Sequence, residues 1–138
     1  MIPIRFDPAK DRATMPFDEH ICRLARDLKK NGLIWQPHVG CFVWDPAAVI
    51  KAESPFPGRI YFILSLPRFI DIFGSIESMV DRLVWLPTWH QARLVCRQLG
   101  ISDTAAADGW PPGAMLPPGE DLALLYRHIA AALRKQSG

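Results

Sequence analysis

Two apolar runs of strand length are each followed by residues of the types that bind anions. Ser65 and Arg68 follow the first run, and Thr88, Trp89 and His90 follow the second. Both groups fall where a helix is predicted to begin, and the free backbone N–H groups of a helix N-terminus attract negative charge. Arginine adds a planar donor that suits phosphate or carboxylate. These five residues are therefore a candidate binding site for a small anionic ligand.

The five residues form one site only if the two runs are neighbouring parallel strands. The stretch from 59 to 99 is predicted to run strand, helix, strand, helix, an order typical of a right-handed βαβ unit. In such units ligands bind in the crevice beyond the carboxyl ends of the strands. A simpler interpretation also fits, because Ser65 and Thr88 are residue types that cap helix N-termini without any ligand.

Histidine and cysteine form weaker patterns. His38 and Cys41 have a spacing that zinc can use, but a closed zinc site needs four ligands. His20 and Cys22 would face different directions on a helix. Cys96 is expected in an apolar helix, a setting that raises the pKa of a thiol and lowers its reactivity. We therefore expect no metal, no cofactor and no catalytic cysteine, and the common nucleotide-binding and hydrolase motifs are absent from the sequence.

The charge balance argues against a dedicated nucleic-acid-binding protein. Sixteen Lys and Arg against fourteen Asp and Glu give a formal net charge of +2, far from the strongly basic balance of such proteins. His90, Arg93 and Arg97 are spaced to form one basic stripe on a helix. That stripe could contact phosphates, but the small net charge favours a solvated helix face as its explanation.

Neither secretion nor membrane insertion is indicated. The first twelve residues, MIPIRFDPAKDR, mix charge and proline where a signal peptide is apolar. The longest apolar runs are too short to span a bilayer. The three cysteines have irregular spacing, which makes a poor disulfide framework. We therefore expect a cytoplasmic protein with reduced thiols and no membrane contact.

Apolar residues recur with helical spacing in four segments. In the first of them Phe17, Ile21 and Leu28 belong to one stripe. In the second, Gly74-Ser75 is expected to interrupt the helix. The predicted helices cover 16–31, 66–82, 88–99 and 120–135.

The remaining apolar runs are short and of strand composition. We predict a hairpin from 33–36 and 41–44, and a parallel pair from 59–64 and 83–86. Together they would form a small mixed sheet covered by the four helices. The predicted fold class is α/β or α+β.

Three further segments complete the predicted domain. Asp45-Pro46 resembles the start of a short helix that would follow it. Residues 1–15 alternate in polarity around a proline, which favours an edge strand or a docked arm. Residues 101–119 form a long loop rich in Pro and Gly. Hydrophobic residues make up 49% of the chain, so we expect 1–138 to fold as one globular domain.

Two features favour a binding function over catalysis. The predicted helix at 66–73 is apolar around most of its circumference, so it is either deeply buried or half-buried in an interface. Trp110, one of five tryptophans, lies in the Pro/Gly-rich loop and must pack onto the body or onto a partner. We expect a non-enzymatic binding or protein-interaction module that self-associates as a homodimer. The alternative is a small enzyme or anion-binding protein that uses the strand-end residues.

Overall fold

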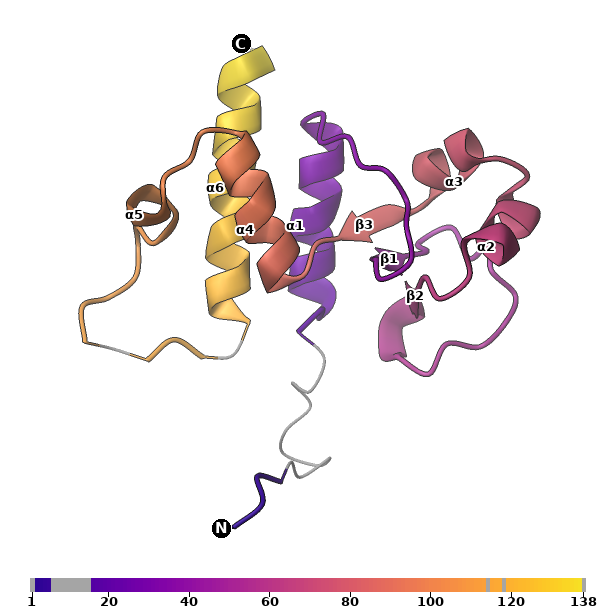
Figure 1. The fold of residues 1–138 in the computed structure, drawn as a ribbon, viewed down its shortest axis with the longest axis horizontal. Helices are drawn as coiled ribbons and strands as arrows, with labels where there is room; N and C mark the ends of the chain where they lie inside the picture. The colour runs from indigo at the N-terminus through magenta and orange to yellow at the C-terminus, as the bar shows by residue number, and fades with distance from the viewer. Residues whose placement is uncertain (1, 6–15, 114, 118, 138) are drawn as a thin grey trace.

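The described part of the chain, residues 2–5, 16–113, 115–117 and 119–137, folds around a small antiparallel sheet in the computed structural model (Figure 1). Its strands are β1 (Phe42–Trp44), β2 (Ile60–Phe62) and β3 (Val84–Leu86). β1 is central and pairs with both others, so that Val43 lies opposite Tyr61 on one side and Trp85 on the other. The fold class is α+β.

The predicted parallel pair is wrong. β2 and β3 run in the same direction, but each pairs antiparallel with β1, which lies between them. A strand–helix–strand order is compatible with two adjacent parallel strands and with two such strands separated by an antiparallel one. Only the position of the third strand, β1, distinguishes the two arrangements. β1 is apolar at Phe42, Val43 and Trp44, a composition that fits a strand covered on both faces.

The predicted hairpin is wrong for the same reason. Residues 33–36 form no strand, because both edges of β1 are occupied by β2 and β3. The 33–36 segment instead crosses the molecule as irregular chain. Trp35 is buried there and Ile34 is exposed, so the apolar composition that resembled a strand places only part of this segment in the core.

The helices agree closely with prediction. They are α1 (Glu19–Lys30), α2 (Leu66–Phe73), α3 (Ile76–Arg82), α4 (Trp89–Gln98), α5 (Asp103–Ala106) and α6 (Glu120–Ser137). The predicted interruption is confirmed: Gly74, at φ +89°, ends α2, and the Ser75 side chain accepts a hydrogen bond from Ser78 N–H to begin α3. α5 is a short helix inside the predicted 101–119 loop.

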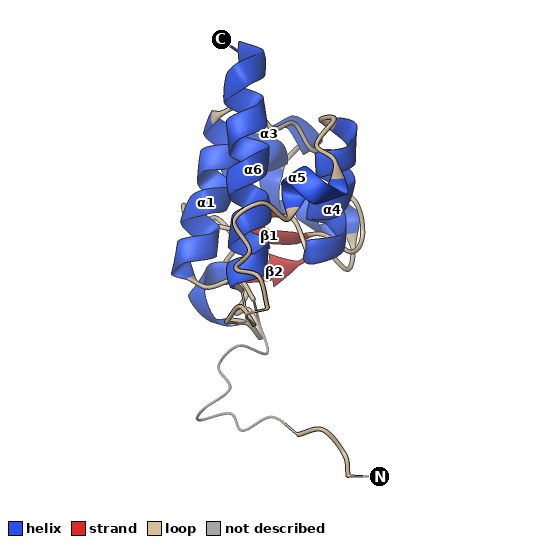
Figure 2. Ribbon diagram, turned by 90° about the vertical axis from the view of Figure 1, so that its left-hand side faces the viewer, coloured by secondary structure: helices blue, strands red, loops and turns tan. Residues whose placement is uncertain are grey.

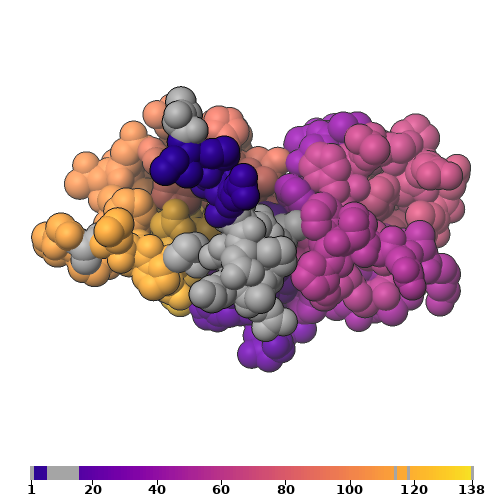
Figure 3. All heavy atoms as spheres, turned by 90° about the horizontal axis from the view of Figure 1, so that it is seen from below, coloured from indigo at the N-terminus to yellow at the C-terminus, as the bar shows by residue number. Residues whose placement is uncertain are grey.

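Helices cover both faces of the sheet. Figure 2 shows α1, α6 and α4 on one side of the strands, and Figure 1 shows α2 and α3 on the other. The first group packs against Ile60, Val84 and Leu86, and the second against Val43 and Tyr61. Seen from below, the late part of the chain, in orange and yellow, lies at one end of the molecule, and the middle of the chain, in magenta, lies at the other (Figure 3). The sheet therefore separates two hydrophobic cores.

The N-terminal arm is described only in part. Residues 2–5 have no strand structure, and Ile2 and Ile4 are exposed. The rest of the predicted arm, residue 1 and residues 6–15, lies outside the described residues. Of the helices that the structure describes, none has the length and apolar character needed to cross a bilayer.

Candidate functional site

The five predicted site residues lie at two separate places. Ser65 and Arg68 begin α2 beside β2, while Thr88, Trp89 and His90 begin α4 after β3. The two strands are opposite edges of the sheet, and the two helices pack into the different cores on its opposite faces. The two helix N-termini therefore do not meet at one rim. Anion binding by either group stays a prediction.

Thr88 has a structural role that accounts for its residue type. Its hydroxyl accepts a hydrogen bond from Gln91 N–H at 3.2 Å, and the Gln91 side-chain oxygen accepts one from Thr88 N–H at 2.9 Å. This capping box satisfies two free N–H groups at the start of α4. Ser65 occupies the N-cap position of α2 without a side-chain hydrogen bond to the helix.

The basic stripe on α4 is partly neutralised by the neighbouring loop. The Arg93 guanidinium donates to the Asp103 carboxylate at 2.5 Å, and an Arg97 nitrogen lies 3.7 Å from the same carboxylate. The hydrogen bond from Arg93 lowers the pKa of Asp103, which keeps the carboxylate charged. A stripe whose cations already face a carboxylate is less available to phosphates.

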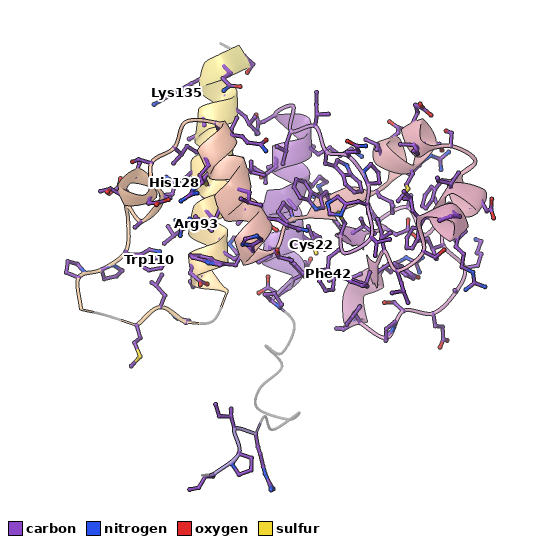
Figure 4. All side chains as sticks on the ribbon, in the orientation of Figure 1. Cys22, Phe42, Arg93, Trp110, His128 and Lys135 are labelled. Atoms are coloured by element: carbon purple, nitrogen blue, oxygen red, sulfur yellow. The ribbon has the colours of Figure 1, made fainter. Side chains whose placement is uncertain are left out.

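Trp110 packs back onto the body of the protein. Its ring stacks on Trp89 with centroids 6.1 Å apart, and Arg93 lies 6.0 Å from the Trp89 ring centroid on the same flank. Figure 4 shows Arg93 and Trp110 on this side of the molecule. The contact anchors the 101–119 loop to α4, one of the two arrangements that the sequence predicted for Trp110.

A buried carboxylate paired with a partly exposed arginine, which the sequence did not reveal, organises the chain between β1 and β2. Asp45 is fully buried, and its carboxylate accepts hydrogen bonds from Val49 N–H at 3.1 Å and Ile50 N–H at 2.8 Å. Arg59 donates to the same carboxylate at 2.9 Å and to the Ile50 carbonyl at 2.7 Å. The predicted short helix after Asp45 is therefore wrong: the carboxylate folds residues 46–50 into a loop around itself.

The loop held by Asp45 borders a hollow beside β2 and α2. The hollow has a volume of about 550 Å³ and is mainly apolar. Three large side chains around it reach solvent, Phe62 at 37%, Leu64 at 76% and Ile72 at 46% exposed. Charged residues at its border are Glu53, Arg68 and Asp71. We call these six residues the β2–α2 surface.

The three cysteines are free and buried. Burial raises the pKa of each thiol, and for Cys22, with the nearby carboxylates of Asp18 and Glu19 adding to the effect, it reaches about 12. Cys22 lies between α1 and the sheet in Figure 4. In the described ranges, no group of three or more His, Cys, Asp or Glu side chains could hold a metal ion.

Thiol titration checks this assignment. The unfolded, unreduced protein is expected to yield three free thiols, and the folded protein is expected to react slowly because buried thiols with raised pKa values form little thiolate. The measurement is the time course of a disulfide reagent at pH 8, with and without urea. Fewer than three thiols in urea, or rapid reaction without urea, would contradict the structure.

No family model, no curated protein and no solved structure matches the chain. Two features of the molecular surface bear on its function. One is the β2–α2 surface, and the other is a hollow between the 32–38 segment and α4.

Proposed function

We propose that the protein is a non-enzymatic interaction module that self-associates through the β2–α2 surface. The observation that carries the proposal is the exposure of Phe62, Leu64 and Ile72 around one apolar hollow. Contiguous apolar surface that remains open to water is typical of protein interfaces. α2 is half-buried, with Phe73 in the core and Ile72 exposed, which is the arrangement expected of an interface helix.

The edge of the sheet adds a second argument. β2 pairs with β1 through Tyr61, and residues of an antiparallel strand alternate in the direction of their hydrogen-bonding groups. The N–H and C=O groups of Phe62 therefore point to the outer edge, where β2 has no neighbouring strand within the described residues. Nearer the start of β2, the Ser54 hydroxyl donates to the Ile60 carbonyl and covers that part of the edge. An open edge beside exposed apolar residues favours pairing with another chain.

The charges on this surface favour a second copy of the same chain as the partner. In a two-fold interface each contact occurs twice. If residue i of one copy meets residue j of the other, then residue j of the first copy also meets residue i of the second. The β2–α2 surface carries a cation, Arg68, and two carboxylates, Glu53 and Asp71, beside its apolar centre. Two copies can therefore match opposite charges across the axis while they bury their apolar residues.

Leu64→Glu tests the proposal. Leu64 is the most exposed of the three apolar side chains of the surface, so the variant should fold normally, but the dimer would have to bury an added carboxylate. We expect the dissociation constant of the dimer to rise by at least about tenfold. The measurement is sedimentation velocity over a range of concentrations, with circular dichroism as the check of folding.

Leu94→Glu is the matched control. Leu94 is also an exposed leucine, 46% accessible, but it lies on α4 outside the β2–α2 surface. The control should dimerise like the wild type. A wild-type chain that is monomeric at all concentrations tested would overturn the proposal. So would a dimer that Leu64→Glu leaves intact and Leu94→Glu dissociates, because that result assigns the interface to α4.

A further inference from the structure

A hollow of about 580 Å³ lies between the 32–38 segment, α4 and the C-terminal end of α6. Its composition is unusual in two ways. All four glutamines of the sequence line it, and they come from the 32–38 segment, α4 and α6: Gln36, Gln91, Gln98 and Gln136. No Asp, Glu, Lys or Arg is among its lining residues, although such residues are 22% of the chain. We call this hollow the glutamine groove.

Two tryptophans in the wall of the groove carry unused hydrogen-bond donors. The indole rings of Trp35 and Trp85 stack with centroids 6.0 Å apart and planes 9° apart. Both indole nitrogens are buried, and neither has a hydrogen-bond partner among the described residues. A buried N–H group without a partner is costly, and native proteins rarely retain one without a reason. Trp35 as a whole is only 8% exposed.

The polar groups of the groove favour a ligand that accepts hydrogen bonds. The indole nitrogens can only donate, and both are closed to solvent, so a ligand in the groove reaches them only if the rings shift. The Gln91 side-chain oxygen is occupied by Thr88 N–H, so its amide NH₂ is the part left for a ligand. The other glutamine side chains can both donate and accept. Leu33, Val95 and Leu99 supply an apolar wall.

We propose that the glutamine groove binds an uncharged heteroaromatic molecule of the nucleobase type. The absence of charged lining residues disfavours an ionic ligand, which would lose hydration without gaining a counter-charge. A neutral planar ring with carbonyl or ring-nitrogen acceptors matches the donors, and side-chain amides pair with the edges of such rings. The volume lies within the range of roughly 300–1,000 Å³ found for small-molecule sites. This site is separate from the β2–α2 surface.

A bound water is the competing partner for the two indoles. Trp35, Trp85 and Lys29 also line a small void of about 10 Å³, which is near the size needed for a single water. If that water satisfied both indoles, a ligand in the groove would leave their N–H groups unchanged. The experiment therefore has to observe the indole protons directly.

The test titrates the full-length protein with adenosine and with uridine, which are uncharged nucleosides, and with AMP as the charged counterpart of adenosine. Assigned NMR spectra follow the five indole protons. We expect saturable binding of at least one nucleoside, with shifts at Trp35 and Trp85 and none at Trp44 or Trp110. AMP is expected to bind no more tightly than adenosine, because no Lys or Arg lines the groove and His38 is the one basic side chain among its lining residues.

Two variants locate the site. Gln36→Leu changes the 32–38 segment and Gln98→Leu changes α4, and each is expected to weaken nucleoside binding about five- to tenfold through loss of a hydrogen bond. Thr104→Leu, an exposed polar-to-leucine change on α5, is the matched control and should bind like the wild type.

Five outcomes would overturn the proposal. The first four are no saturation by either nucleoside at millimolar concentration, binding that both glutamine variants leave unchanged, tighter binding of AMP than of adenosine, and shifts confined to Trp89 and Trp110. The last of these four would place the ligand on the basic flank of α4. Unmoved Trp35 and Trp85 protons at saturation would assign their N–H groups to the buried water and equally contradict the proposal.

Discussion

Asp45→Ala is expected to destabilise the protein by about 2–6 kcal/mol, because it removes a fully buried carboxylate that is the acceptor for two backbone N–H groups. The carboxylate is fully buried and receives Val49 N–H, Ile50 N–H and Arg59. Its loss leaves two backbone donors without an acceptor, at about 1–3 kcal/mol each. The side chain also holds backbone that is otherwise unfavourable, since Ala48 and Arg59 have φ values of +57° and +63°.

Urea unfolding measures this loss, with the midpoint and the slope compared between variants. Asp108→Ala is the matched control, since Asp108 is exposed and its carboxylate makes no hydrogen bond in the described structure. We expect its effect to stay within about 0.5 kcal/mol. Asp45→Asn should fall between the two, because an amide oxygen still accepts a hydrogen bond. A loss below about 1 kcal/mol for Asp45→Ala would show that the 46–58 loop does not depend on this carboxylate.

Helices and their ends were predictable because their signals are local. The apolar stripe of α1, the glycine after α2 and the hydroxyl residues before α3 and α4 each act within about one turn. In α4 the cap even extends to a full capping box, since Gln91 follows Thr88 by three residues. These features can be read directly from the sequence, so the predicted and observed ends of the helices agree to within about three residues.

The topology of the sheet was not predictable in the same way. Whether β1 inserts between β2 and β3 depends on pairing between residues such as Phe42 and Leu86, which lie far apart in sequence. A three-residue strand is too short for its pattern of apolar residues to indicate which strands pair with it. The predicted strand-end site depended on that pairing. Its residues were individually well placed at helix starts, but the sheet does not bring them together.

Asp45 and the glutamine groove show two other limits of sequence reasoning. Asp45-Pro46 matches the pattern of a helix start, and only the position of Arg59 reveals that the carboxylate binds a loop and a partly exposed cation instead. The glutamines were visible in the sequence, but no motif joins them, because they reach the groove from an irregular segment and two helices. The sequence shows the uncharged polar residues and the tryptophans, but only the fold shows that they lie close together.

Ile129→Ala is expected to cost about 2–5 kcal/mol, the range for large-to-small substitutions at fully buried sites. Ile129 lies in the middle of α6, is inaccessible to solvent and belongs to the core that joins α6 to α1 and α4. Leu125, one turn earlier on the same stripe, should behave alike when replaced by alanine. Lys135→Ala, at an exposed position of the same helix, is the control and should change stability by less than about 0.5 kcal/mol. Losses below about 0.5 kcal/mol for both core variants in urea unfolding would mean that α6 is not docked against α1. In that case the glutamine groove would lose one of its walls, since Leu133 and Gln136 line it from the last turns of α6.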